Sequence, residues 1–220
     1  MHRRRSLEPR LALVADWCRP YAVVADIGAG GGQLSRYLAD HGHSVIATER
    51  SAPGAAVLRQ ALAGCPSAVV RQGDGFQALR DLGRPFDVAV VAGMGGPTIL
   101  RIVSEAPWGV PVVVQPMQGW RALRQGLAAA AFRWVKAGLC HQRDRFYPAW
   151  MVVRADEGQR FEPLVPREMA CHPEYPAWLE REWQRGMRST RRQKTPSEAV
   201  WLEVIGEEVQ RWRGKTSLSD

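Results

Sequence analysis

Residues 23–32 of the chain read VVADIGAGGG, an apolar run that reaches an acid and then a cluster of glycines. An amphipathic stretch, QLSRYL, follows at residues 33–38. This order indicates a buried parallel strand, a tight turn, and a helix whose first backbone N–H groups face any ligand above the turn. Glycine suits such a turn because it adopts positive φ and has no Cβ to hold a ligand away from the main chain. The stretch therefore predicts a ligand-binding turn, although a crowded turn without a ligand has the same need for glycine.

The length and composition of the chain fit one α/β domain with an appendage. It has 220 residues, of which 45% are hydrophobic, and no apolar run reaches the length of a membrane span. The basic start is not followed by the apolar segment of a signal peptide, and the four cysteines show neither a CxxC motif nor metal-ligand spacing. We therefore expect a cytoplasmic protein with reduced thiols and no bound metal.

Apolar β-branched runs alternate with amphipathic segments along most of the chain. This alternation predicts an α/β fold with a doubly wound, mostly parallel, Rossmann-like sheet. We expect this domain to cover residues 1–160 and a C-terminal helical hairpin to cover residues 161–220. The expected strands are 23–27, 44–48, 68–71, 86–91, 110–114, 134–140 and 149–154, and the expected helices of the domain are 7–19, 34–40, 53–63, 98–105 and 119–131.

Acids and glycines stand at the ends of four of the expected strands. In doubly wound sheets, ligands bind beyond the carboxyl ends of the strands, so these residues should meet at one edge. Glu49 follows Gly28 by 21 positions, near the spacing at which an acid takes the ribose hydroxyls of a nucleoside cofactor. Four loops that converge on one edge are a stronger indication of a site than any single loop. The loops contain Gly28–Gly32, Glu49, Asp74 and Gly93–Gly96.

The glycine turn differs from those of several nucleotide-binding families. Gln33 stands where the dinucleotide fingerprint has its third glycine, which argues against NAD and FAD, and the chain has no P-loop motif. The pattern resembles class I S-adenosylmethionine-dependent methyltransferases. That resemblance implies that Asp26 and the glycine loop take the amino-acid end of the cofactor, Glu49 the ribose and Asp74 the adenine. The alternative is that Asp26 only holds the turn, while Glu49 and Asp74 cap the helices after them.

Further motifs narrow the resemblance. They are Glu49-Arg50, RQGDGF at 71–76, VAGMGG at 91–96 and VQP at 114–116. Together they resemble the bacterial tRNA (adenine-22-N1)-methyltransferases. That family also has an Arg-Leu pair before the glycine loop, a Leu-Arg pair after its Gln-Pro segment and an aromatic residue before its last strand. The matching positions are Arg10-Leu11, Leu123-Arg124 and Phe146-Tyr147. The resemblance covers nearly the whole chain and implies methylation of N1 of adenine 22 in tRNA, with S-adenosylmethionine as cofactor.

Carried over to matching positions, the resemblance also implies a set of site residues. The implied cofactor-binding residues are Arg10, Asp26, Gly28, Gly30, Glu49, Arg50, Asp74, Gly75, Gly93, Met94 and Gly95. Adenine N1 carries an in-plane lone pair and the sulfonium methyl is already activated, so alignment should dominate over acid–base chemistry. No residue stands out as a general base. Met94, Gln115 and Tyr147 are the weak candidates for a catalytic role.

Two positions depart from the family pattern. The family usually continues its first loop with Asp-His, where this chain has Gly30-Gly31, and it usually reads Gln-Pro-Asn, where this chain has Met117 after Gln-Pro. These changes remove polar side chains from beside the cofactor or the target base. Two alternatives follow: a methyltransferase of the same fold that acts on another RNA or a small molecule, and a non-catalytic RNA-binding relative.

The C-terminal region predicts a helical hairpin that could contact RNA. Apolar residues recur at helical spacing over 174–192, and Thr195 followed by Pro196 and Glu198 is typical of a helix start. An arginine row lies on another face of the first helix, and the formal net charge of +8 is compatible with tRNA as a partner. The alternative is a solvated helix face. The row consists of Arg181, Arg185, Arg188 and Arg192.

Overall fold

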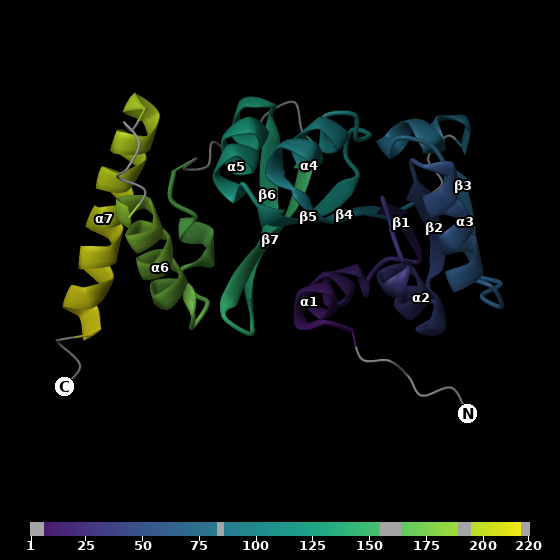
Figure 1. Ribbon diagram of the computed structural model, residues 1–220, viewed down its shortest axis with the longest axis horizontal. Helices are drawn as coiled ribbons and strands as arrows, with labels where there is room; N and C mark the ends of the chain where they lie inside the picture. The colour runs from purple at the N-terminus through teal and green to yellow at the C-terminus, as the bar shows by residue number, and fades with distance from the viewer. Residues whose placement is uncertain (1–6, 83–85, 155–163, 189–194, 217–220) are drawn as a thin grey trace. The chain divides into compact units, whose positions relative to one another are not determined.

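The computed structural model describes residues 7–82, 86–154, 164–188 and 195–216 (Figure 1). The chain divides into two compact units, Met1–Arg160 and Phe161–Asp220. Within the described ranges, none of the helices has both the length and the apolar character needed to cross a membrane.

The first unit is built on one seven-stranded sheet. Its strands are β1 (Val23–Ile27), β2 (Ser44–Glu49), β3 (Ala68–Gln72), β4 (Val88–Gly95), β5 (Pro111–Gln118), β6 (Phe132–Gln142) and β7 (Arg145–Arg154). The strand order is β3-β2-β1-β4-β5-β7-β6. The five strands β1–β5 run parallel to their neighbours, whereas β7 is antiparallel to both β5 and β6. The order reverses between β1 and β4, which confirms the predicted doubly wound, Rossmann-like fold.

Helices cover both faces of this sheet. They are α1 (Pro9–Cys18), α2 (Gln33–Asp40), α3 (Ala52–Ala61), the 3₁₀ helix η1 (Gly75–Leu82), α4 (Gly96–Val103) and α5 (Trp120–Ala129). In Figure 1, α1 and α2 lie below the sheet and α4 and α5 above it. Both faces of the central strands are therefore buried, which explains why β4 and β5 read as continuous apolar runs.

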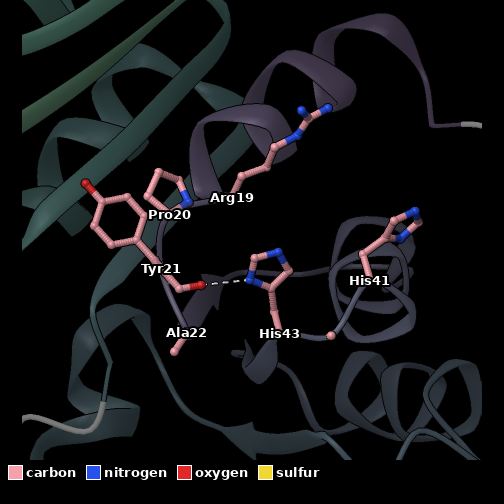
Figure 2. A pocket seen from close by; sticks show the side chains of 7 residues that line it. Arg19, Pro20, Tyr21, Ala22, His41 and His43 are labelled. Atoms are coloured by element: carbon pink, nitrogen blue, oxygen red, sulfur yellow. Dashed lines mark hydrogen bonds between the residues drawn. The ribbon is translucent and has the colours of Figure 1, made fainter.

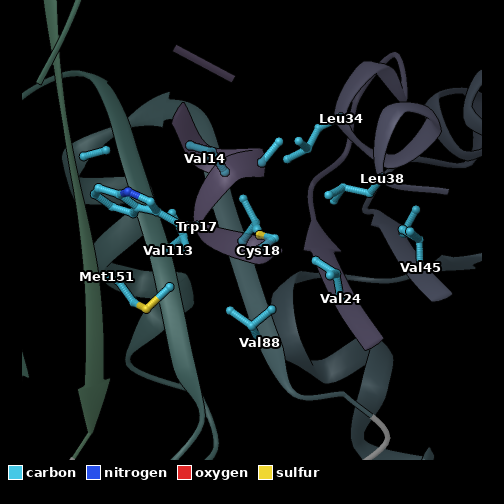
Figure 3. Close-up of a cluster of buried hydrophobic side chains, with 14 of the residues drawn as sticks. Val14, Trp17, Cys18, Val24, Leu34, Leu38, Val45, Val88, Val113 and Met151 are labelled. Atoms are coloured by element: carbon cyan, nitrogen blue, oxygen red, sulfur yellow. The ribbon is translucent and has the colours of Figure 1, made fainter. Parts of the chain in front are cut away.

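The core beneath α1 and α2 fixes the position of α1 on the sheet. Figure 3 shows Val14, Trp17 and Cys18 of α1 beside Val24 and Val88 of the strands. Burial of each large apolar side chain stabilises the fold by about 1.5–3 kcal/mol. Gly138 of β6 makes room for α1, because a Cβ there would lie 2.8 Å from Cζ2 of Trp17. Since α1 ends beside the start of β1, its first turn lies toward the opposite, carboxyl edge of the strands.

The last two strands differ from the sequence prediction. The sequence predicts separate strands over 134–140 and 149–154, with residues 143–147 between them. In the structure β6 and β7 form one long hairpin, paired from Phe132↔Arg154 to Gln142↔Arg145. Only the two-residue turn Arg143-Asp144 lies outside the strands. Tyr147, expected before the strand, is therefore part of it.

The second unit contains two packed helices and a short 3₁₀ turn. These are η2 (Arg167–Met169), α6 (Tyr175–Arg188) and α7 (Pro196–Thr216). A Cβ at Gly186 would touch Leu202, and one at Gly206 would touch Trp183, so the helices run antiparallel in close contact. The predicted C-terminal helical hairpin is thereby confirmed.

The start of α7 is fixed by the predicted capping residues. The backbone N–H of Glu198 donates to Thr195 Oγ1 at 3.3 Å, and the backbone N–H of Thr195 donates to Glu198 Oε2 at 2.9 Å. These reciprocal bonds form a capping box, which satisfies donors that the first helical turn leaves without partners.

Candidate active site at the carboxyl edge of the sheet

The glycine loop after β1 is tied to the end of β2. The backbone N–H of Gly28 donates to Thr48 Oγ1 at 3.2 Å, and that of Ala29 donates to the Thr48 carbonyl oxygen at 2.8 Å. Gly28 and Gly30 both have positive φ, as the turn requires. A Cβ at Gly28 would collide with the Met94 side chain, so Met94, predicted near the cofactor, does lie against this loop.

Asp26 faces the interior below the loop. Its side chain is 4% exposed, and Ser35 Oγ donates to its Oδ2 at 2.5 Å. Burial raises the pKa of the Asp26 carboxyl to about 6, although the hydrogen bonds from Ser35 lower it. Burial, with Asp26 nearby, also raises the pKa of the Cys18 thiol to about 12. Asp26 links β1 to α2, which fits the interpretation that it holds the turn.

Glu49 is held by one carboxylate oxygen at the start of α3. Its Oε1 accepts hydrogen bonds from the backbone N–H of Ser51 at 3.1 Å and from Ser51 Oγ at 3.2 Å. Gly54 leaves space for this arrangement, because a Cβ there would lie 2.8 Å from Glu49 Cγ. The other oxygen, Oε2, has no bond to any described residue. Arg50, the next predicted residue, is exposed.

The loop after β3 reaches the same edge. The Gly73 N–H donates to the Glu49 carbonyl oxygen at 3.0 Å, which places Asp74 and Gly75 beside the end of β2. Arg101 of α4 donates from Nη2 to Asp74 Oδ1 at 3.0 Å. The sequence alone does not indicate a role for Arg101, because its partner lies 27 positions away and no local pattern joins them. Gly75 has a φ of +55°, as a tight turn into η1 requires.

Arg10 and Gln115 meet behind the loop after β4. Arg10 Nη1 donates to Gln115 Oε1 at 3.1 Å, and its Nε donates to Glu8 Oε2 at 3.0 Å. Gln115 is fully buried, and its Nε2 donates to the Pro116 carbonyl oxygen at 2.8 Å. Gly93 has a φ of +81°, and a Cβ there would lie 3.7 Å from Arg10 Nη1. Gln115, a neutral amide engaged at both ends, is suited to holding Arg10 rather than to taking a proton.

The remaining candidates lie close to this edge with different exposure. Gly95 ends β4 opposite Gln118 of β5. Tyr147 is 8% exposed and stands three positions before Trp150, which pairs with Val114, so it lies toward the carboxyl end of β5. Met117 is 39% exposed. Met117 rather than Tyr147 therefore offers an open apolar surface.

The predicted arginine row of α6 is partly neutralised. Arg185 Nη1 forms an ion pair with Glu182 Oε1 at 2.5 Å, and Arg181 and Arg188 are exposed. Glu180, on the same helix, pairs with Arg213 of α7 at 2.8 Å. Arg192 lies outside the described residues. Acids one turn away thus share this surface with the arginines, which the spacing of the arginines alone did not reveal.

A pocket of about 540 Å³ lies at the other edge of the sheet (Figure 2). Arg19, Tyr21 and Ala22 before β1 line it together with His41 and His43 before β2. The parallel strands β1 and β2 begin at this edge, whereas the loops described above follow the ends of the strands, so the pocket is separate from those loops. Among the residues that the structure describes, no group of three or more His, Cys, Asp or Glu side chains could hold a metal ion.

Comparisons with known proteins agree with this fold. One similar structure is Streptococcus pneumoniae Sp1610 in complex with S-adenosyl-L-methionine, which is 20% identical to this chain. The alignment covers 93% of this chain and 100% of Sp1610, with a TM-score of 0.76. M. capricolum TrmK in complex with S-adenosyl-homocysteine shares 17% identity, with coverages of 96% and 98% and a TM-score of 0.75. The B. subtilis M1A22 tRNA methyltransferase TrmK shares 19% identity, with coverages of 93% and 96% and a TM-score of 0.70.

These identities show a shared fold and no more. A comparison with curated proteins found no match. The sequence model described as "Methyltransferase domain" matches residues 7–149, which is more than half of the chain and includes every loop of the candidate site. The chain therefore belongs to the methyltransferase domain family.

Proposed function

We propose that this protein is an S-adenosylmethionine-dependent tRNA methyltransferase that methylates N1 of adenine 22. The observation that carries the proposal is that solved tRNA (m1A22) methyltransferases match the whole chain: B. subtilis TrmK covers 93% of it. The likeness thus extends beyond the methyltransferase domain at 7–149 into the C-terminal unit. A tRNA substrate would place the enzyme in the cytoplasm.

The glycine loop supports a cofactor at the carboxyl edge. A Cβ at Gly31 would have no atom within 4 Å, and the backbone of Gly31 does not have positive φ. The space above the backbone at Gly31 is therefore open, so a ligand could approach the main chain there. The residues present fit S-adenosylmethionine: the loop at Gly28 and Gly30 would hold its amino-acid end and Glu49 Oε2 its ribose.

The other predicted residues complete this assignment. Asp74 and Gly75 would hold the adenine of the cofactor, and Gly93, Met94 and Gly95 would line the space between cofactor and target base. Arg10 of α1, bonded to Gln115, and Arg50, which follows Glu49 at the end of β2, would contact the cofactor. Asp26 would act indirectly by holding the loop through Ser35.

The proposed chemistry asks little of the side chains. S-adenosylmethionine, when bound, supplies a methyl group on a sulfonium, which is already a good electrophile. The lone pair of adenine N1 lies in the plane of the base, so the protein has to align the base and exclude water. In folded RNA the base must also be turned out of its stack. Met117 provides an open apolar surface for it, and Gln115 keeps Arg10 in place behind the loop.

Methyl transfer to defined acceptors tests the proposal. Purified protein is incubated with S-adenosylmethionine labelled in its methyl group and with an unmodified tRNA transcript, an unrelated structured RNA, or no RNA. We expect label in the tRNA alone. Transfer to the unrelated RNA at an equal rate would favour a broader RNA methyltransferase. Cofactor binding and RNA retention without transfer would favour the non-catalytic relative, in which Gly30-Gly31 and Met117 have removed activity.

A further inference from the structure

The positive charge of this chain is concentrated in one part of the methyltransferase unit. Residues 161–220 hold ten basic and ten acidic side chains, whereas residues 1–160 hold twenty basic and twelve acidic ones. The formal charge of +8 thus belongs entirely to the first unit. Residues 106–155, which contain β5, α5, β6 and β7, hold seven basic side chains and a single acid, Asp144. A polyanionic substrate is therefore attracted chiefly to this end of the sheet.

The cations of the other end are mostly paired. Arg36 pairs with Asp40 at 3.2 Å, Arg71 with Asp81 at 2.6 Å, and Arg101 with Asp74 at 3.0 Å. Arg143 and Arg145, at the turn between β6 and β7, are exposed, and no ion pair with a described residue holds either of them. These two guanidinium groups remain available to an external anion.

The pairing of the strands places this turn at the edge that carries the candidate site. β7 pairs with β5 up to Val114↔Trp150, and the hairpin then continues to Gln142↔Arg145. The residues of β7 that precede Trp150 therefore lie toward the carboxyl end of β5, and the turn of the hairpin extends beyond that end. We call residues 141–146 the hairpin tip. Its base is packed, since Leu139 is buried and Gly138 lies against Trp17 of α1, so the tip is presented on a fixed support.

Two details of the hairpin tip suit contact with RNA. Arg143 has a φ of +55°, a conformation that favours glycine or asparagine in two-residue hairpin turns and is unfavourable for arginine. An arginine therefore stands there at a cost in stability. The His141 and Phe146 rings stack across the hairpin with centroids 4.4 Å apart and planes at 15°. Cations beside a flat aromatic pair are a common combination on RNA-binding surfaces.

We propose that the hairpin tip binds the sugar-phosphate backbone of the RNA substrate beside the active site, through Arg143 and Arg145. The proposal rests on the proposed function only in taking RNA as the substrate. Phosphate contacts of this kind position the substrate without reading its sequence. The hairpin tip thereby takes the role that the sequence analysis assigned to the arginine row of α6.

Charge reversal with matched controls tests this surface. The test variant is Arg143→Glu with Arg145→Glu. The first control is Arg133→Glu with Lys136→Glu, two exposed cations of the same hairpin that lie away from its tip. The second control is Arg181→Glu with Arg188→Glu on α6. Affinity for an unmodified tRNA transcript is measured by fluorescence anisotropy from 50 to 300 mM salt, and S-adenosylmethionine affinity by calorimetry.

We expect the test variant to bind tRNA at least about tenfold more weakly than the wild type at 0.1 M salt. The slope of log Kd against log salt concentration should be shallower than that of the wild type by roughly one to two. Its S-adenosylmethionine affinity should match that of the wild type, and both controls should bind tRNA more tightly than the test variant. Arg143→Gly should also weaken tRNA binding while the melting temperature stays constant or rises, since glycine tolerates the positive φ.

Three results would overturn the proposal: unchanged tRNA affinity in the test variant, an equal loss in the first control, or a larger loss in the α6 control. Binding is measured without turnover, so a failure of the proposed function remains distinguishable. If the wild type binds tRNA through the hairpin tip but transfers no methyl group, the RNA surface stands and the assignment as a methyltransferase of tRNA falls.

Discussion

Glu49 combines a fixed position with an oxygen that is open to a ligand. Ser51 holds Oε1 through two hydrogen bonds, and Gly54 leaves the space that the side chain needs. The carboxylate is thus oriented before any ligand binds. Preorganisation of this kind lowers the entropy lost on binding. The free oxygen of this carboxylate would accept hydrogen bonds from the two ribose hydroxyls of the cofactor.

Substitution of Glu49 by Gln should weaken S-adenosylmethionine binding by roughly one to two decades. The amide keeps the shape of the side chain but loses the charge, and a hydrogen bond to a charged group contributes about 1.5–3 kcal/mol. Calorimetry measures the affinity. Asp40→Asn is the matched control, because it also removes one negative charge but lies at the end of α2, away from the site. Equal affinities in wild type and Glu49→Gln, with the fold intact, would contradict the role of Glu49.

Asp26 should make the stability of the protein depend on pH, because its carboxyl is buried. Its pKa is raised from 3.8 to about 6 in the folded state, chiefly by burial. As the pH rises from about 4 to 6, the unfolded chain releases this proton before the folded one does. The folded state binds more protons in that window, so stability falls as the pH rises. The contribution amounts to about 3 kcal/mol, at 1.36 kcal/mol per pKa unit.

The variant Asp26→Asn should lose this pH dependence. Asparagine still offers an oxygen to the Ser35 hydroxyl but does not ionise. The difference in unfolding free energy, variant minus wild type, should therefore increase by up to about 3 kcal/mol between pH 4 and pH 7. Urea titrations at several pH values measure it, and groups that titrate identically in both proteins cancel. A difference that is constant over this range would show that Asp26 ionises in the folded state as it does in the unfolded chain.

The glycine loop is the element whose sequence departs from the family pattern and whose structure remains consistent with a cofactor. Gly28 and Gly32 are explained by positive φ and by close contact with Met94 and Leu58. Gly31 is explained by neither. The fold therefore needs glycine at Gly28 and Gly32 but leaves open space at Gly31, where the family pattern has a histidine.

Gly31→Val should leave stability nearly unchanged and weaken S-adenosylmethionine binding at least tenfold. The added side chain enters open space in the free protein, but it is apolar and would lie beside the charged amino-acid end of a bound cofactor, where the family pattern has a polar histidine. Thermal unfolding and calorimetry measure the two effects. Gly32→Val serves as the contrasting variant: a Cβ there would lie 2.9 Å from Leu58 Cδ1 and φ is +72°, so it should lower the melting temperature. Unchanged cofactor affinity in Gly31→Val would show that the cofactor does not contact the loop at this residue.

Elements that carry a strong periodic pattern were predictable from the sequence, and those that depend on distant partners were not. The central strands β1, β4 and β5 read as apolar runs because both of their faces are buried. The β6–β7 hairpin was predicted as two separate strands, because Arg143-Asp144 is not one of the glycine-containing pairs that mark a two-residue turn. The hairpin tip therefore went unnoticed until the pairing of its strands was known.

The candidate site shows the same division. The sequence placed Gly28, Glu49 and Asp74 at strand ends, and parallel pairing alone brings such ends together. Ser35, the partner of Asp26, and Arg101, the partner of Asp74, lie on helices, at separations that no local pattern encodes. A sequence can therefore indicate which residues reach the edge of the sheet, but not which of them the protein itself engages.

At the scale of the whole molecule, the distribution of charge separates the two units. The total charge of +8 is compatible with RNA as a partner, and the sequence suggests the arginines of α6 as the RNA-binding surface. Acids on α6 pair with arginines on α7, as Glu180 does with Arg213. The second unit has as many acidic as basic side chains, so its formal net charge is zero. The charge that would attract RNA lies beside the candidate active site itself.

Mapping the methylated nucleotide tests the proposed function most directly. Wild-type protein, S-adenosylmethionine and an unmodified tRNA transcript are incubated together, and reverse transcription then reads the RNA, since a methyl group on adenine N1 blocks base pairing. We predict a stop immediately before position 22 that requires the cofactor. The stop should be absent from a transcript with guanine at that position and should weaken with Glu49→Gln. Methylation at a different nucleotide, or equal methyl transfer to the guanine-22 transcript, would contradict the assignment.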